Sequence, residues 1–295
     1  MRRNLPAAAV VAAASLWGLM GLFVRRFSAA GLGSLEITQV RILCGLVLLG
    51  AYLALRRPEK LRVRLRDVWC FLGTGVVSLL LFSYCYFRTM TLTSLAVAGV
   101  LLYTAPVFVA LLSALLFRER LTGGKLAALA LAVSGCALVS GIGGGGDLSA
   151  AGLLLGLGSG FFYALYSIFG RFAIARGYGA WTITFYTFLF CAAGGAFLCD
   201  WPAVAAAFAA DAGLWPWTAA MGLATAFAAY LLYTWGLERM EAGRASILAS
   251  VEPVVAAVVG VLAFREALAP RTLLGICFVL GAIVLLNCRK TVNIS

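Results

Sequence analysis

The chain has 295 residues, of which 63% are hydrophobic and only 12% are charged, and its formal net charge is +12. This balance excludes a soluble globular domain, and no polar stretch is long enough to form a second, soluble domain. Because the basic residues lie between apolar runs, the positive charge indicates membrane orientation, and nucleic acid is not an expected partner.

Ten apolar stretches follow one another along the chain, and each has the roughly 17 to 25 residues that a membrane-spanning helix needs. They begin near Leu5, Leu35, Val68, Ser94, Leu126, Ala151, Trp181, Leu214, Ala245 and Thr272. Lipid cannot hydrogen-bond an exposed backbone, and the stretches are too long for barrel strands. The sequence therefore predicts an all-α polytopic membrane protein with ten transmembrane helices.

The first stretch follows Arg2 and Arg3 and extends to about Val24. A signal-peptide core is shorter, usually about 7 to 15 residues, so this stretch is expected to stay in the protein as its first helix.

The distribution of basic residues predicts the orientation. Counted over alternate loops, 17 of the 23 basic residues lie on the side of the N-terminus and five on the other. The positive-inside rule therefore places both termini in the cytoplasm, and we expect a multi-pass protein of the plasma or inner membrane. The basic loop from Arg56 to Asp67 suits the anionic lipids of the cytoplasmic face. Arg41, near the start of the second stretch, is expected to snorkel to the interface.

The chain contains an internal repeat. PVFVALLSALLFRERL, which begins at Pro106, aligns with PVVAAVVGVLAFREAL, which begins at Pro253, at an offset of 253 − 106 = 147 residues, and eight of the sixteen positions are identical. Two five-helix repeats are predicted, over residues 1–142 and 147–290. Since five is odd, the second repeat enters the membrane from the opposite side, which predicts an inverted repeat, as in many secondary transporters.

A glycine-rich segment, GIGGGGD, lies between the two repeats at Gly141 to Asp147. It lacks the Lys-Ser/Thr pair of a phosphate-binding P-loop, so a nucleotide site is not expected. Residues 143–146 are interpreted as the linker between the repeats.

Three motifs resemble a known family. SLWG in the first helix, TAPVFVALLSALLFRERL from Thr104 and VEPVVAAVVGVLAFREAL from Val251 are similar to segments of the EamA-type drug/metabolite transporters. The resemblance spans essentially the whole chain. It implies a central cavity that opens to alternate sides of the membrane, and export or exchange of amino acids, nucleobases or other metabolites.

Glu252 is the one carboxylate that the sequence places well inside an apolar stretch, and its partner in the first repeat is Ala105. An ionisable residue in such a place is a candidate for function, here for substrate binding or for coupling transport to protons. The alternative is a satisfied polar group near a helix start. The pairs Arg118-Glu119 and Arg265-Glu266 are interpreted as markers of helix ends rather than as gating ion pairs.

Aromatic residues gather on the helices that the resemblance places around the cavity. Together with Glu252, the candidate substrate-binding residues are Trp17, Tyr86, Tyr103, Tyr163, Tyr166, Tyr230 and Tyr233. For each of these rings, packing against neighbouring helices or a place in the interfacial aromatic belt is the alternative to ligand contact.

The chain has no histidine, and its eight cysteines form no CxxC pair. These absences argue against an enzyme, a metal site or a cofactor, and the cysteines are interpreted as small buried apolar residues. The expected partners are a small-molecule substrate, the lipid bilayer and protons, and the protein is expected to be a monomer or a homodimer. The alternatives to a coupled exporter or exchanger are an uncoupled uniporter, a non-transport membrane subunit and an intramembrane enzyme.

Overall fold

The computed structural model describes residues 5–92, 95–140, 149–265 and 269–288, and every regular element in these ranges is helical. The all-α prediction is therefore confirmed, whereas the predicted linker at 143–146 lies outside the described residues. In chain order the elements are α1 (Leu5–Gly18), α2 (Met20–Ser28), α3 (Ser34–Arg56), η2 (Pro58–Leu61), η3 (Leu65–Asp67), α4 (Val68–Leu72), η4 (Gly73–Leu80), α5 (Leu81–Leu92), α6 (Leu95–Leu102), α7 (Ala105–Phe117), α8 (Gly123–Ser140), α9 (Ala150–Ala175), α10 (Ala180–Gly195), α11 (Trp201–Ala210), α12 (Leu214–Met221), η5 (Gly222–Ala228), α13 (Ala229–Leu237), α14 (Ala242–Ala249), α15 (Glu252–Phe264) and α16 (Pro270–Cys288).

Six of the helical spans are long and apolar enough to cross a membrane: Leu5–Ser28, Ser34–Arg56, Leu65–Leu92, Ala150–Ala175, Leu214–Leu237 and Ala242–Phe264. Five shorter apolar helices accompany them, at Ala105–Phe117, Gly123–Leu138, Ala180–Gly195, Trp201–Ala210 and Pro270–Leu285. Each of the ten predicted stretches coincides with one of these helices or with a pair of consecutive ones. The sequence did not predict α11, whose ten residues are too few to span a bilayer.

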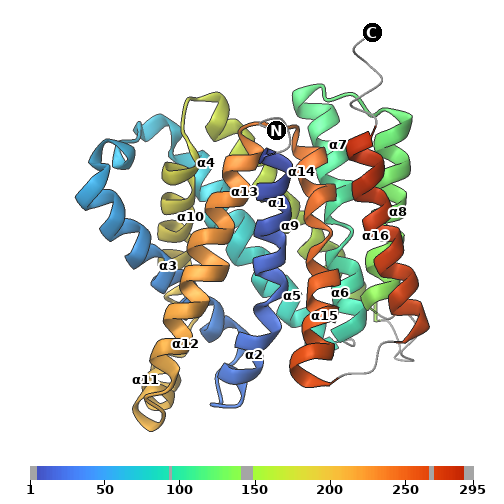
Figure 1. Cartoon of the computed structure of the whole chain (residues 1–295). Helices are drawn as coiled ribbons and strands as arrows, with labels where there is room; N and C mark the ends of the chain where they lie inside the picture. The colour runs from blue at the N-terminus through green and yellow to red at the C-terminus, as the bar shows by residue number, and fades with distance from the viewer. Residues whose placement is uncertain (1–4, 93–94, 141–148, 266–268, 289–295) are drawn as a thin grey trace.

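Helices from the two halves of the chain pack against each other rather than forming two separate bundles (Figure 1). Helix α1 lies against α13, α14 and α15, α9 lies against α5, α6 and α7, and α8 lies against α16. The centre of the molecule, between α1, α9 and α13, is therefore built from both halves.

The two ends of the helix bundle differ in charge. At the end that is uppermost in Figure 1, α1 begins, α16 ends, and the basic segment 57–67 joins α3 to α4. Asp67 is buried there, where it accepts a hydrogen bond from the Tyr178 hydroxyl (2.8 Å) and pairs with Arg176 (3.1 Å). We call this the basic end.

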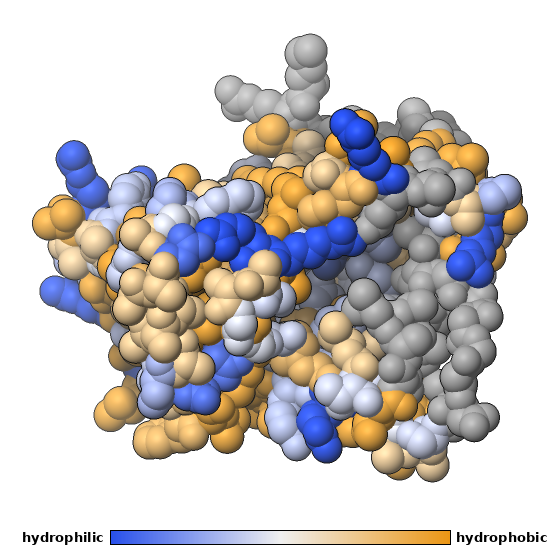
Figure 2. Space-filling view, turned by 90° about the horizontal axis from the view of Figure 1, so that it is seen from below, coloured by the Kyte–Doolittle hydropathy of each residue, from blue (hydrophilic) through white to orange (hydrophobic). Residues whose placement is uncertain are grey.

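The opposite end carries α11 and the last turn of α2, which are joined by an ion pair between Arg26 and Asp211. We call it the α11 end. Figure 2 views the molecule from this side: a row of strongly hydrophilic residues crosses the middle of the face, and hydrophobic residues lie on both sides of it.

The repeat seen in the sequence recurs in the geometry. Helices α14 and α15 have the same bounds as α6 and α7 when 147 is subtracted (242 − 95 = 264 − 117 = 147). Arg118 and Arg265, which follow α7 and α15, both have left-handed backbones, with φ of 54° and 55°. Each half also contains a π-helical segment in corresponding places, η4 and η5.

Candidate functional site

Two apolar segments, one in each half of the chain, are each interrupted at equivalent places and so form two consecutive helices. Helix α6 ends and α7 begins around Tyr103 and Thr104, and α14 and α15 meet around Ser250 and Val251. A proline follows each break within the first two positions of the new helix, where its missing N–H is tolerated. As a result Glu252 is the first residue of α15 and yet lies in the interior of the continuous apolar span Ala242–Phe264.

Glu252 is half-buried, and several polar side chains surround it. Its carboxylate interacts with the Tyr163 hydroxyl of α9 and with the positive charge of Arg41 of α3. Its charge also acts on Tyr86 of α5 and on Tyr103 at the α6–α7 break. We call Glu252 with Tyr86, Tyr103 and Tyr163 the Glu252 cluster. All four candidate side chains are half-buried, so they stay partly accessible.

Glycine permits the helices around Glu252 to approach closely. A Cβ atom at Gly18, the last residue of α1, would lie 2.8 Å from the Glu252 carbonyl oxygen and 2.7 Å from the Val255 side chain. A Cβ atom at Gly160 of α9 would lie 2.9 Å from the Leu101 carbonyl oxygen, beside the α6–α7 break. The glycine of the SLWG motif therefore has a structural reason, because a larger residue would push α1 away from α15.

Four further candidate rings pack together next to this cluster. Trp17 contacts Tyr230 and Tyr233 at centroid distances of 5.1 and 5.4 Å, and Tyr166 contacts the same two rings at 5.4 and 6.0 Å. We call Trp17, Tyr166, Tyr230 and Tyr233 the aromatic tetrad. All four are buried, with exposed fractions of 8% or less.

Hydrogen bonds within the chain satisfy most polar groups of the tetrad. The Trp17 indole donates to the Thr225 carbonyl in η5 (3.0 Å). The Tyr166 hydroxyl lies 2.6 Å from Thr234 Oγ1, and the Tyr233 hydroxyl lies 2.8 Å from Ser167 Oγ. The tetrad thus has the character of packed core rather than of open binding surface.

A small cavity of about 20 Å³ lies between the tetrad and η4. This volume is enough for about one water molecule and far below the range for ligand pockets, about 300 to 1,000 Å³, so the helices must separate before a substrate fits there. The lining residues are Trp17, Ser78, Leu79, Phe82, Tyr163, Tyr166, Ser167, Tyr230 and Tyr233. Five of the eight predicted site residues are among them, and Tyr163 connects the cavity to the Glu252 cluster.

The other three predicted residues lie beside the cavity rather than in its wall. Tyr86 stacks on Phe82, a lining residue, at 5.9 Å, and Tyr103 and Glu252 lie next to Tyr163 through their electrostatic contacts. Sequence reasoning missed Ser78, Leu79, Phe82 and Ser167 as lining residues, because nothing in their local pattern distinguishes them from other residues of apolar helices.

The prediction that Arg41 snorkels to the interface is wrong. The Arg41 side chain is buried, with an exposed fraction of 8%, and it faces the interior of the bundle, where its charge acts on Tyr163, Tyr230 and Cys191. The physical reason is the packing of α3: the face that carries Arg41 lies toward α2 and α10 and not toward lipid, and Arg41 Nη1 lies 3.8 Å from Met20 Sδ of α2.

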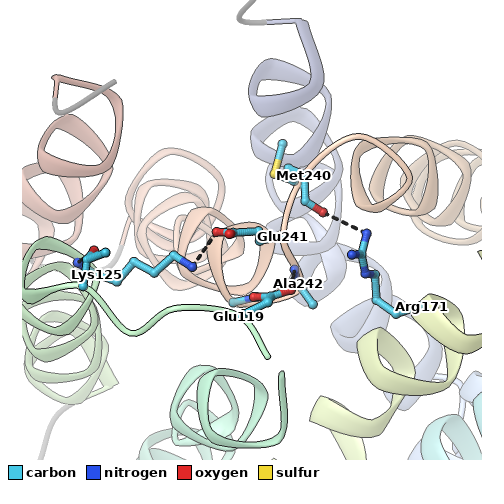
Figure 3. A network of polar contacts seen from close by, with 8 residues as sticks. Glu119, Lys125, Arg171, Met240, Glu241 and Ala242 are labelled. Carbon is cyan, nitrogen blue, oxygen red and sulfur yellow. Dashed lines mark hydrogen bonds and ion pairs between the residues drawn. The ribbon is translucent and has the colours of Figure 1, made fainter. Parts of the chain in front are cut away.

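At the basic end, a polar network connects the two halves of the chain (Figure 3). Glu119, just after α7, accepts hydrogen bonds from the backbone N–H groups of Ala242 (2.9 Å) and Gly243 (3.4 Å) and thereby caps α14. Lys125 pairs with Glu241, and Arg171 donates to the carbonyls of Leu237 and Met240, both at 3.4 Å. Glu119 therefore marks a helix end, as predicted, but the end belongs to the other half of the chain.

Within the described residues, no group of three or more cysteine, aspartate or glutamate side chains is placed to hold a metal ion. The site offers instead one carboxylate, one guanidinium, several phenol hydroxyls and aromatic faces. Groups of these kinds are chemically able to bind and orient a small polar molecule by charge and hydrogen bonding.

Comparison with known proteins gives a consistent result. The EamA-like transporter family matches residues 5–141 and 150–288. An uncharacterized transporter of Archaeoglobus fulgidus is 30% identical over 278 residues, 94% of either chain, and the uncharacterized transporter YxxF of Bacillus subtilis is 29% identical over 248 residues, 82% of this chain and 76% of that one. A solved crystal structure shares the fold, with a TM-score of 0.78 over 99% of this chain and all of the other, at 20% identity.

Proposed function

Because this chain belongs to the EamA-like transporter family and is a multi-pass membrane transporter, we propose that it moves small metabolites by alternating access, as an exporter or exchanger driven by protons or by counter-substrate. A central polar site favours polar substrates, and we propose amino acids, nucleobases or related compounds. The supporting observation is the position of Glu252, at a helix break inside an apolar span and beside Tyr163.

We propose ten transmembrane helices, arranged as two inverted five-helix repeats over residues 1–142 and 147–290. The six long spans and four of the five shorter apolar helices supply the ten, and α11 lies at the membrane surface because about 15 Å of helix cannot cross a bilayer. The matching bounds of α6–α7 and α14–α15 support the repeat.

The proposed orientation places the basic end, and with it both chain termini, in the cytoplasm of a plasma or inner membrane. Segment 57–67 and the residues Lys125, Arg171 and Arg176 gather at that end, which supports this choice and a contact with anionic lipid. A membrane-impermeant thiol reagent should miss a cysteine that replaces Arg62 in intact cells and should label one that replaces Ala212 at the α11 end. The reverse labelling pattern would reject the orientation.

We propose that the Glu252 cluster contacts the substrate and that Glu252 itself binds the proton. The aromatic tetrad forms the adjoining wall of the site. Most polar groups of the tetrad are hydrogen-bonded to Thr225, Thr234 and Ser167, whereas the Glu252 cluster is partly accessible and contains the carboxylate.

The substitution Glu252→Gln tests the role of the carboxylate, because it preserves size and hydrogen bonding but cannot titrate. We expect gradient-driven accumulation in proteoliposomes to fall by about tenfold or more, since the group that carries the proton is lost, while exchange without a gradient survives. The matched control is Asp211→Asn, which removes an exposed carboxylate at the α11 end and should leave transport unchanged. An unchanged response of Glu252→Gln to the pH gradient would overturn proton coupling through this residue.

An uncoupled uniporter is the alternative within transport, and it predicts that substrate flux in vesicles ignores an imposed pH gradient even in the unmodified protein. A screen of amino acids, nucleobases and cationic toxic compounds, with empty vesicles as the control, identifies the substrate class. A flat response to all of these compounds would count against the proposed function.

A further inference from the structure

The first helical span of each half contacts the other half through an arginine and a phenylalanine. At the α11 end, the Arg25 guanidinium of α2 lies over the Phe264 ring of α15, 3.7 Å from its centroid (Figure 1). Their counterparts in the repeat are Arg171 of α9 and Phe117 of α7 (171 − 25 = 146 and 264 − 117 = 147). The guanidinium of Arg171 lies 5.9 Å from the Phe117 centroid, at the basic end. The repeat thus produces one arginine–phenylalanine contact at each end of the molecule.

These two contacts differ in strength. A guanidinium is attracted to an aromatic face when it lies within about 6 Å of the ring centroid. Arg25 lies well inside this limit. Arg171 lies at the limit, and its guanidinium donates instead to the carbonyls of Leu237 and Met240. The contact is therefore closed at the α11 end and loose at the basic end.

A second pair of contacts, near the middle of the bundle, differs in the same sense. The Trp17 indole of α1 donates to the Thr225 carbonyl of η5, at 3.0 Å. The counterparts of these residues are Tyr163 of α9 and Ser78 of η4 (163 − 17 = 146 and 225 − 78 = 147). Tyr163 and Ser78 both line the small cavity, and none of the hydrogen bonds found between described residues joins the two. Here too, the contact made by the first half is closed and its counterpart is open.

The acceptor of the Trp17 hydrogen bond lies in an unusual segment. Both η4 and η5 are π-helical, and π-helical turns are rare and occur frequently at functional sites. A side chain that inserts into the backbone hydrogen bonds of a helix holds a local distortion of that helix in place. Trp17 does this to η5 from the other half of the chain.

We propose that these two sets of contacts are latches, of which one is closed at a time. The first latch consists of the Trp17–Thr225 and Arg25–Phe264 contacts, and the second latch consists of their counterparts in the repeat. The first latch is closed in the state described here and holds the α11 end together. The second latch closes, with Tyr163 donating to the backbone of η4, when the molecule changes to its other state.

The inverted repeat gives a physical reason for this exchange. Two copies of one fold that enter the membrane in opposite orientations can take two conformations, and the molecule changes state when the copies exchange them. A contact that is closed for one half is then loose for the other, as both pairs of contacts are here. Because the exchange is alternating access, the latches rest on the proposed transport function.

The first latch separates the small cavity from the α11 end. Trp17 lines this cavity, whose volume of about 20 Å³ holds about one water molecule. When the first latch opens, α1 is freed from η5 and α2 is freed from α15, so the cavity can widen toward the α11 end. Trp17 is therefore a positioning residue that acts through the backbone of η5, in addition to its packing within the tetrad.

Hydrogen–deuterium exchange of the α2 backbone, measured by mass spectrometry on the full-length protein in lipid nanodiscs, tests the latches. The amides of α2 should exchange in proportion to the population of the state in which the first latch is open. Trp17→Phe keeps a ring but removes the donor. It should therefore speed α2 exchange by about fivefold, which is the effect of one hydrogen bond.

Two leucine substitutions at equivalent places provide a matched comparison. Phe264→Leu removes an aromatic face from the first latch and should speed α2 exchange by about two- to fivefold. Phe117→Leu removes the same face from the second latch, which stabilises the other state, and should slow α2 exchange by a similar factor. A purely structural role of Phe117 would not slow exchange at the opposite end of the molecule. These two variants also decide the question if Trp17→Phe does not fold.

Phe197→Leu is the control, because it removes a ring that is 92% exposed and belongs to neither latch, and it should leave α2 exchange unchanged. Size-exclusion chromatography and thermal unfolding establish that each variant is folded. Faster or unchanged α2 exchange in Phe117→Leu, or unchanged exchange in Phe264→Leu, would overturn the latches. Either result, together with a solute found by the transport screen, removes the latches and leaves the transport function. The expected exchange pattern together with a flat screen leaves the latches and removes the transport function.

Discussion

The aromatic tetrad and the Glu252 cluster are neighbours built largely from the same residue type, yet they differ in how their polar groups are satisfied. In the tetrad, Trp17, Tyr166 and Tyr233 all find partners within the chain. In the Glu252 cluster the side chains are half-buried, and the buried Ser250 hydroxyl, two residues before Glu252, has no hydrogen-bond partner among the described residues. We therefore expect the buried tetrad, whose hydroxyls are bonded to neutral groups of the chain, to belong to the scaffold, and the half-buried cluster around the carboxylate to be available to a ligand.

The largest effect that separates the two regions should come from Trp17→Ala. This change removes a buried ring that touches Tyr230 and Tyr233, and the cavity left behind should lower the free energy of unfolding by about 3 to 5 kcal/mol. Glu252→Gln, by contrast, should leave the free energy of unfolding nearly unchanged while it impairs transport. Equilibrium unfolding of both variants in mixed micelles measures the difference, and equal destabilisation would remove the distinction between scaffold and site.

A smaller and more closely matched effect is expected from a pair of tyrosine substitutions on α9. Tyr166→Phe leaves the Thr234 hydroxyl without its 2.6 Å partner and should cost about 1 kcal/mol of stability with little change in substrate affinity. Tyr163→Phe removes the hydroxyl that contacts Glu252 and should weaken substrate binding with little loss of stability. Each variant lacks one oxygen atom, so each is the control for the other. If Tyr166→Phe were the variant that lost affinity, the assignment of the two regions would be reversed.

Much of the fold could be predicted from sequence because helix length in a membrane is a local property. Ten apolar stretches gave helix starts within three residues of those observed, for example Ala245 against the actual start at Ala242. Pro106 and Pro253 were visible in the repeat, but their effect was not predicted: they follow breaks that place Glu252 both at a helix start and inside a span. Interpreting Glu252 as a functional carboxylate inside an apolar span therefore does not exclude interpreting it as a polar group near a helix start.

The site was predicted less completely, since it depends on which face each helix turns to the bundle. When a helix is apolar on nearly all of its faces, its sequence does not indicate which face turns toward the bundle. The burial of Arg41 could therefore not be read from its place near the start of α3. The division of the aromatic residues into tetrad and cluster depends on contacts between α9 and α13, such as Tyr166 with Thr234, that are 68 residues apart in the chain. No local pattern reports such a pairing.

The arginines that follow α7 and α15, both with left-handed backbone conformations, indicate how the molecule evolved. A side chain in that conformation costs on the order of 1 kcal/mol relative to glycine, which adopts it freely, and yet arginine stands there in both halves, with φ of 54° and 55°. A shared, mildly unfavourable detail of this kind is most simply inherited from a single ancestral half that was copied. Glu252 and its counterpart Ala105 differ, so the asymmetry of the charged site arose after the copying, when one half acquired or the other lost a carboxylate.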